Sequence, residues 1–294
     1  TTYTQILNKD GGIEIDCTVV CLEKNYFRII SSAATRERDK FFILNNISKD
    51  IIFEDVTDKY CCLGVFGPKS RDLLSKISQD NFSNENFKFG TGKFVKINDM
   101  KVWAQRLSYV GEIGFELYIE TLHAKQLYKA IVEEGNNHNL IHCGMHAMDT
   151  MRMENGFLHW GNDISPEENQ YQAGLDFAIS YKKNVDFLGK EALLKIKDKK
   201  NQKKMIMLTL KDKKPGDPLL LHDEPIYLDD RIIGRTTSGN YSFNFNKNLT
   251  FGYVDRDVNN LDTSKHKIYV EVGKVKHEAE YLPKVLNQNN YKTI

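Results

Sequence analysis

Hydrophobic and polar residues alternate through the first thirty residues of the chain. Residues 2–7, 14–22 and 26–32 each show this period of two, which is typical of a β-strand with one buried face. The first two runs are joined by a turn that contains Asp10-Gly11-Gly12, in which glycine supplies positive φ angles. The pattern predicts strands joined as hairpins.

The middle of the chain mixes the periods of helix and strand. We expect helices at residues 35–46, 123–134, 144–153 and 186–196, and one that follows Gly67-Pro68 and contains Leu73, Leu74 and Ile77. We expect strands at residues 51–56, 60–66, 94–97, 101–107 and 115–119. This mixture predicts the α+β fold class.

Short strand patterns recur at regular spacing in the last third of the chain. They cover residues 204–210, 225–227, 232–237, 249–254, 267–272 and 274–281. Turn sequences such as Pro215-Gly216-Asp217 and Ser238-Gly239-Asn240 separate some of them. Such spacing is typical of a small β-barrel or sandwich domain.

The composition is that of an ordinary globular protein. The 294 residues are 40% hydrophobic and 28% charged, and the formal net charge is +1. A near-neutral charge gives no support to nucleic-acid or membrane-surface binding as the main activity. No apolar run approaches the roughly 20 residues of a membrane span.

Five cysteines, an odd number without regular spacing, argue against a disulfide framework and for a reducing compartment. Cys17 and Cys21 share a strand face but have no further Cys or His beside them, so we expect no zinc site. Cys61 and Cys62 point to opposite faces of a strand and are interpreted as strand core. The chain also lacks GxGxxG, the P-loop, GxSxG and HExxH.

Glu116 is the first candidate for chemistry. It lies in an apolar strand after the turn Gly111-Glu112-Ile113-Gly114, with Tyr118 on the same face and Tyr109 just before the turn. A carboxylate in such surroundings needs a partner, because burying an unpaired charge is costly. That partner is either an internal arginine, with Arg152 the candidate, or a ligand with paired N–H donors.

Asp16 and Arg152 are further candidates, each with two interpretations. Asp16 occupies a strand face with Glu14 and Thr18, so it is either solvated or positioned beside a ligand to hold or relay a proton. Arg152 lies on a helix rich in methionine and is expected to satisfy a carboxylate, either Glu116 or Asp149.

Seven motifs stand out along the chain. They are YTQILN (3–8), GGIEIDCTV (11–19), GPKSR (67–71), YVGEIGFE (109–116), DTMRME (149–154), HWGNDI (159–164) and TSGNYS (237–242). They occur in the order found in the glycine-cleavage T-protein (aminomethyltransferase) superfamily, which the chain resembles over nearly its whole length. The HWGNDI form is more similar to the folate-binding region of dimethylglycine and sarcosine dehydrogenases than to a stand-alone T-protein.

The resemblance implies a three-lobed folate-binding fold with a C-terminal β-barrel. The second lobe would be residues 1–63 plus 164–197, the remaining half of the first lobe residues 64–163, and the barrel residues 198–294. A segment that the family has before YTQILN is missing, so we expect the first lobe to be incomplete and the chain to be part of a longer polypeptide. Met148 also replaces an arginine of T-proteins.

The resemblance further implies a tetrahydrofolate site. Asp16 matches the catalytic acid beside folate N5 and N10, Glu116 the carboxylate that grips the pterin, and Tyr3 and Tyr109 pocket tyrosines; Arg152 is the fifth expected site residue. The implied reaction forms 5,10-methylenetetrahydrofolate from an N-methyl amine such as dimethylglycine or sarcosine. FAD is expected only on a separate or upstream domain, and the partner would be that flavin domain or subunit.

Two alternatives to this function remain. One is a stand-alone aminomethyltransferase or another folate-dependent demethylase, and the other is a non-catalytic folate-fold scaffold that docks a flavin subunit. We expect the location to be cytoplasmic, or the mitochondrial matrix in a eukaryote.

Overall fold

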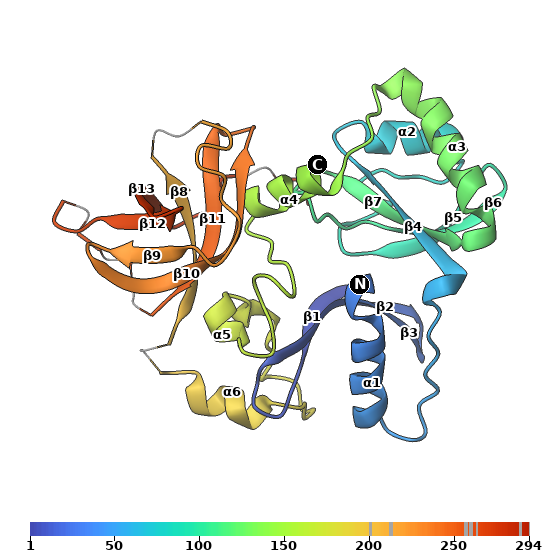
Figure 1. Cartoon of the computed structure of the whole chain (residues 1–294). Helices are drawn as coiled ribbons and strands as arrows, with labels where there is room; N and C mark the ends of the chain where they lie inside the picture. Colours follow the sequence, from blue (N-terminus) through green and yellow to red (C-terminus); the bar gives the residue numbers. More distant parts are fainter. Residues whose placement is uncertain are drawn as a thin grey trace. The chain divides into compact units, whose positions relative to one another are not determined.

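The computed structural model describes residues 1–199, 202–211, 214–255, 258, 261–262, 264–287 and 290–293. It consists of two compact units, each of which is described by itself. Unit 1 comprises Thr1–Thr2, Thr18–Met148 and Asn289–Ile294, and unit 2 comprises Tyr3–Cys17 and Asp149–Gln288. Figure 1 colours the chain from its blue N-terminal strands to its red C-terminal strands.

The first three strands form the predicted antiparallel hairpins. They are β1 (Thr2–Leu7), β2 (Ile13–Glu23) and β3 (Tyr26–Ile30), in the order β1-β2-β3. The division between the units falls within β2, after Cys17. Asn8 fixes the first turn, because its side-chain oxygen accepts the backbone N–H groups of Asp10 and Gly12, at 3.0 and 2.9 Å.

Unit 1 is built on a four-stranded sheet in the order β4-β7-β6-β5. The strands are β4 (Tyr60–Phe66), β5 (Gly92–Ile97), β6 (Met100–Gln105) and β7 (Gly114–Glu120). One face carries the apolar residues of the alternating pattern, such as Phe115 and Leu117, and α2 (Ser70–Ile77) and α3 (Ala124–Gly135) cover it through Leu74 and Leu127 (Figure 1). Burial of these side chains stabilises unit 1.

The opposite face of this sheet carries the side chains that alternate with the core residues along each strand. Tyr118 lies directly across from Cys62 on β4 and from Trp103 on β6. The rings of Tyr118 and Trp103 are buried against Val20 of β2. Cys61 packs against the helix-covered core, so the two neighbouring cysteines do point to opposite faces, as predicted.

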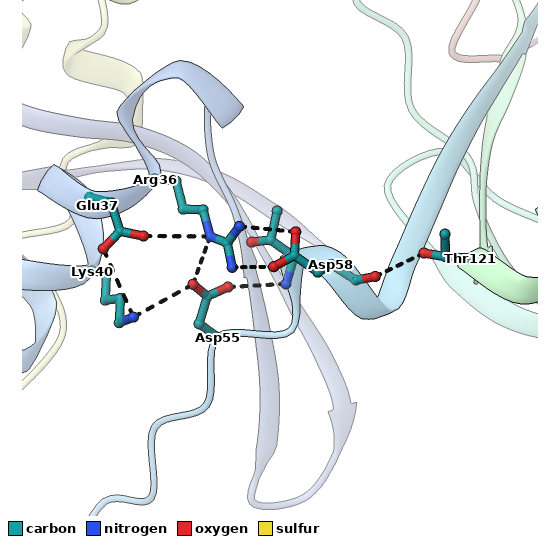
Figure 2. Close-up of polar contacts among 7 residues, drawn as sticks. Arg36, Glu37, Lys40, Asp55, Asp58 and Thr121 are labelled. Carbon is teal, nitrogen blue, oxygen red and sulfur yellow. Dashed lines mark hydrogen bonds and ion pairs between the residues drawn. The ribbon is translucent and has the colours of Figure 1, made fainter.

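The strand predicted at residues 51–56 is wrong. After α1 (Arg36–Asn46) the chain is irregular up to the short 3₁₀ helix that precedes β4, and Ile52 is 97% exposed, because no neighbouring strand meets this apolar stretch. Charges hold the segment instead. Figure 2 shows the Arg36 guanidinium between Asp55 and Asp58. The nitrogen–oxygen distances to these two aspartates are both 2.8 Å.

Unit 2 contains the barrel and, among its described residues, three α-helices. The helices are α4 (Met145–Glu154), whose first turn belongs to unit 1, α5 (Gln170–Ala173) and α6 (Lys190–Ile196). The helix expected at 186–196 thus begins only at Lys190. Short 3₁₀ helices lie at Ala33–Thr35, Thr57–Lys59, Thr121–His123, Asn136–His138 and Asp176–Ala178.

Six antiparallel strands close the predicted barrel in the order β10-β11-β8-β13-β12-β9. They are β8 (Lys204–Leu210), β9 (Pro225–Leu228), β10 (Arg231–Ser242), β11 (Lys247–Val254), β12 (Ile268–Val272) and β13 (Val275–Leu282), orange to red in Figure 1. Alternate residues fill the interior, among them Leu208 and Val270, while Met207 and Phe251 pack outside against Met153 of α4.

Candidate functional site

Glu116 is a half-buried carboxylate held from two sides. Tyr118, two residues further along β7 on the same face, donates its hydroxyl to Oε2 at 2.7 Å. Gln105, directly opposite on β6, donates its side-chain amide to the same oxygen at 3.3 Å. Both of these hydrogen bonds from described residues therefore end on Oε2 rather than on Oε1.

The neighbouring side chains also fix the orientation of Gln105. This residue is fully buried, and the indole N–H of Trp103 donates to its Oε1 at 3.4 Å. Because the oxygen faces Trp103, the amide N–H₂ group faces Glu116. The chain of hydrogen bonds from Trp103 through Gln105 therefore presents Glu116 as an acceptor in a set direction.

Burial raises the pKa of Glu116 above its ordinary value of 4.5, and the hydrogen bond from Tyr118 opposes that rise. Burial also raises the pKa of Tyr118, and the negative charge of Glu116 adds to this effect. Tyr118 consequently stays protonated and acts as a donor. The hydrogen bond from Tyr118 therefore favours the carboxylate form of Glu116, which burial disfavours.

Tyr109 lies in the irregular segment that leads into β7 and is half-buried. Gly111 in this segment has a φ of 69°, the left-handed conformation that glycine adopts without strain. The carbonyl of Ile113 accepts the backbone N–H of Gly67 at 2.8 Å, which ties the segment to the start of α2. Tyr109 and Glu116 thus belong to consecutive parts of unit 1.

In unit 2, Asp16 lies among neutral hydrogen-bond donors. Gln5 on β1 donates its side-chain amide to Oδ1 of Asp16 at 2.9 Å, and Gln170 of α5 donates to Oε1 of Gln5 at 2.9 Å. Tyr3 forms a further side-chain hydrogen bond with Asp16. Gln5 and Gln170 also line a pocket of about 340 Å³. Two of the expected site residues, Tyr3 and Asp16, are thus joined by a hydrogen bond.

Desolvation dominates the electrostatics of Asp16. Burial raises its pKa from 3.8 to about 6, while the hydrogen bonds from Gln5 and Tyr3 act in the opposite direction. No cation is among the causes of the shift, in contrast to an aspartate in an ion pair. A carboxyl group with such a pKa exchanges its proton close to neutral pH, which is what general acid–base chemistry requires.

Trp160 anchors the start of β2. Its indole N–H donates to the carbonyl of Ile13 at 3.1 Å, and its ring packs against the core of unit 2. Gly12 is also essential to this junction, because a Cβ there would lie 2.0 Å from the carbonyl oxygen of Pro166. Trp160 is therefore a packing anchor that helps to hold the strand carrying Asp16.

Arg152 lies at the centre of a buried ion-pair network in unit 2. It is 1% exposed, and its guanidinium donates to Asp149 at 2.7 Å and to Asp163 at 2.5 Å. Further hydrogen bonds join it to the hydroxyl of Ser238 on β10, at 2.7 Å, and to the carbonyl of Phe157, at 3.1 Å. Asp149 is one of the two carboxylates, Glu116 or Asp149, that we expect to pair with Arg152. Asp163 is a second partner that the sequence did not indicate.

We expect the substitution Arg152→Met to lower the free energy of unfolding by about 3–5 kcal/mol, because it leaves the fully buried Asp163 without its cation. Urea-induced unfolding monitored by circular dichroism measures this change. The control is Arg235→Met, since Arg235 and its partner Asp223 are both exposed and such pairs contribute little. Equal stability of the two variants would contradict a structural role for Arg152.

Two other expectations concern ions and membranes. Among the described residues, no group of three or more His, Cys, Asp or Glu side chains is arranged to hold a metal ion. Within the same part of the chain, no helix has both the length and the apolar character needed to cross a membrane.

The side chains that orient the two carboxylates are not recognisable in the sequence. They are Gln5, Gln170, Trp103 and Gln105. Glutamine carries no motif, and its partner is visible only once strand register is known. The same-face spacing of Tyr118 and Glu116 was the one available signal.

Two family models together match most of the chain. The model described as the GCVT N-terminal domain matches residues 1–183, and the glycine cleavage T-protein C-terminal barrel domain matches residues 203–287.

Curated relatives include both oxidising enzymes and transferases. The chain is 36% identical over 257 residues to the 4-methylaminobutanoate oxidase (formaldehyde-forming) of Paenarthrobacter nicotinovorans, covering 87% of this chain and 31% of the oxidase. It is 32% identical to human mitochondrial dimethylglycine dehydrogenase, covering 86% of this chain and 29% of that enzyme. It is also 32% identical to an aminomethyltransferase of Caldanaerobacter subterraneus, covering 86% of this chain and 66% of that enzyme. The chain thus spans about a third of the oxidase and dehydrogenase relatives.

Among solved structures, the glycine cleavage system aminomethyltransferase T of Bartonella henselae is similar in fold. The TM-score is 0.81 at 21% sequence identity, over 97% of this chain and 74% of that one. The predicted α+β fold with its C-terminal barrel is confirmed.

Proposed function

The chain belongs to the glycine cleavage T-protein family, and we therefore propose that it transfers a one-carbon unit to tetrahydrofolate. Members of this family bind tetrahydrofolate. The observation that carries the proposal is Glu116, a half-buried carboxylate with no cation among the causes of its pKa shift and with neutral donors fixing one of its oxygens. Such a group is prepared for a ligand that supplies further N–H donors.

The donor set of unit 1 fits a pterin ring. A pterin presents N3–H and the 2-amino group side by side, and a carboxylate accepts such a pair in two parallel hydrogen bonds. Tyr118 and Gln105 hold Glu116 in one orientation, so little freedom is lost when the ring binds. Tyr109, in the segment before β7, is proposed as a further binding residue.

Asp16 is proposed to manage the proton in the transfer reaction. Tetrahydrofolate supplies the two amines, N5 and N10, that accept the one-carbon unit. Asp16 would orient these amines through its carboxylate and take up a proton at a carboxyl oxygen, which its pKa of about 6 permits near neutral pH. Tyr3 would hold Asp16 and line the binding site, and Arg152 would act on the site through the fold of unit 2.

We propose that the one-carbon unit comes from an N-methyl amine oxidised elsewhere. The names of two relatives, 4-methylaminobutanoate oxidase and dimethylglycine dehydrogenase, describe such oxidations. The flavin for that step would belong to a separate or upstream domain, and this chain would capture the released carbon as 5,10-methylenetetrahydrofolate. A reducing compartment, either the cytoplasm or the mitochondrial matrix, suits this chemistry. Residues 1–63 with 164–197, 64–163 and 198–294 remain our proposed lobes.

The test combines binding with turnover. We expect the chain to bind tetrahydrofolate in an anaerobic titration and, when supplied with formaldehyde or with an amine oxidase and its N-methyl substrate, to accelerate the loss of free tetrahydrofolate. Binding without acceleration would favour the non-catalytic scaffold. Acceleration only with the aminomethyl-carrying protein of a glycine cleavage system would favour the stand-alone aminomethyltransferase, a function found among the relatives. Absence of binding would contradict the proposal.

A further inference from the structure

Phe66, the last residue of β4, lies across two glycines of the sheet. A Cβ built on Gly64 would stand 2.5 Å from the Cε2 atom of the Phe66 ring, and one built on Gly114 would stand 2.1 Å from its Cδ1 atom. Non-bonded carbon atoms do not approach so closely, so the ring occupies the space that side chains at both positions would need. Glycine at residues 64 and 114 is therefore what allows the ring to lie on the backbone of β4 and β7.

This position places the ring beside Glu116. In the antiparallel register, Gly64 is directly opposite Glu116, and Gly114 is directly opposite Phe66 and two residues before Glu116 on the same face. Glu116 therefore has Gln105 on one side and, on the other, a glycine overhung by the Phe66 ring. The carboxylate is bordered by a donor from β6 and by an aromatic surface from β4.

The surroundings leave this part of the sheet accessible. Gly64 is exposed and Phe66 is half-buried, whereas Phe115 and Leu117 on the opposite face are completely buried under the helices. A phenylalanine that packed into the core would instead point to the opposite face of the sheet, as Phe115 does. The Phe66 ring is thus held at the accessible surface of the sheet, on the same face as the carboxylate.

We propose that Phe66 is the stacking surface for the flat ring whose N–H donors Glu116 accepts. This inference rests on the proposed function and extends it, because it assigns the aromatic contact that accompanies the charged one. Stacking and an in-plane pair of hydrogen bonds are compatible, since a planar heterocycle offers its donors at its edge and its π-surface above and below. Together they select a flat, donor-bearing heterocycle over a flexible amine or carboxylate ligand.

Gly64 makes this inference testable without altering any group that contacts the ligand. The three atoms nearest to a Cβ on Gly64 all belong to the Phe66 ring, so we expect Gly64→Ala to displace the ring while Glu116 keeps its side chain. At Gly114 the same Cβ would also meet the carbonyl oxygen of Val65 at 2.8 Å, so a substitution there would disturb the sheet. Gly64→Ala is therefore the informative change.

The experiment is an anaerobic titration of the whole chain with tetrahydrofolate, in which the bound pterin is also followed by its absorbance. We expect Phe66→Leu and Gly64→Ala each to weaken binding on the order of tenfold and to reduce the absorbance change that stacking causes, while Phe66→Tyr retains both. The control is Phe94→Leu, since Phe94 is an exposed aromatic residue of the same sheet that packs edge-on to Trp103.

The outcomes separate this inference from the proposed function. Tetrahydrofolate binding by the native chain that is unchanged in Phe66→Leu would overturn the stacking role and leave the proposed function intact. A loss in Phe66→Leu that Phe66→Tyr does not restore would also overturn it, because the effect would then follow from packing. Failure of the native chain to bind tetrahydrofolate would overturn both.

Discussion

Replacing Glu116 with glutamine is expected to weaken tetrahydrofolate binding by about 100-fold or more. Glutamine keeps the shape of the side chain but replaces one acceptor oxygen with an N–H₂ donor, which opposes the donors of the pterin. A hydrogen bond to a charged group contributes about 1.5–3 kcal/mol, and each 1.4 kcal/mol corresponds to a factor of ten in affinity. Glutamine loses one of the two bonds and makes the other to a neutral oxygen, so both charge-assisted bonds disappear, which gives the expected magnitude. An anaerobic titration measures it.

The matched control for this substitution is Glu120→Gln. Glu120 is the last residue of the same strand. It lies four residues after Glu116 and on the same face of the sheet, but it is exposed to solvent. We expect its replacement to leave the affinity unchanged. Native affinity in Glu116→Gln would remove the pterin assignment, and an equal loss in both variants would indicate a general effect of charge.

Tyr118→Phe provides a graded version of the same test through pH. Because the hydrogen bond from Tyr118 opposes the rise in the pKa of Glu116, its removal should raise that pKa further. Binding requires the carboxylate form, so affinity in the variant should begin to fall at a higher pH than in the native chain as the solution is acidified. Titrations over a pH series measure this shift, and coincident pH profiles would contradict it.

The strands and the barrel could be predicted from the sequence because one face of each strand is buried. The alternation in β1, β2 and the barrel strands directly records which side chains point into a core. The prediction of a strand at residues 51–56 was wrong because apolar residues in this stretch are not buried. Its apolar residues suggested a buried strand, but Asp55 and Asp58 anchor it to Arg36 and Ile52 remains in solvent.

The site could be predicted only in part, because motifs identify charged residues and register identifies their partners. Asp16 and Glu116 were found from their apolar surroundings. Gln5 and Gln105, which hold them, are neutral residues whose role depends on a strand neighbour 11 residues away in each case. Phe66 was hidden for a similar reason, since its position depends on two glycines that meet only after β4 and β7 pair.

The substitution Asp16→Asn is expected to lower the rate of one-carbon transfer by roughly 100- to 10,000-fold, the range that a positioned proton-transferring group contributes. Asparagine keeps the size of the side chain and an oxygen that can accept the amide of Gln5, but it cannot take up a proton. Transfer is measured by the loss of tetrahydrofolate with formaldehyde. The control is Glu14→Gln, two residues earlier on the same face of β2.

The pH dependence of the native rate should show the group responsible. With a pKa of about 6, Asp16 is a carboxylate above that pH and a neutral acid below it. The native rate should therefore rise as the pH increases through about 6, while the residual rate of Asp16→Asn should not change there. A native rate that is independent of pH between 5 and 7, or normal transfer by the variant, would remove the proton role.

The substitution Asp16→Asn should increase the stability of the chain at pH 8, although it lowers the activity. The pKa of Asp16 in the folded chain, about 6, lies above its ordinary value of 3.8, so the folded state binds the proton more tightly than the unfolded state does. The resulting stabilisation is complete below pH 3.8 and is lost as the pH rises through about 6. Above that pH the buried charge destabilises the native chain. Asp16→Asn should therefore unfold at a higher urea concentration than the native chain at pH 8, and this difference should shrink as the pH falls to 4.

A variant that is inactive and yet more stable at pH 8 cannot owe its inactivity to misfolding. An equal or lower stability of the variant at pH 8 would contradict the desolvation of Asp16.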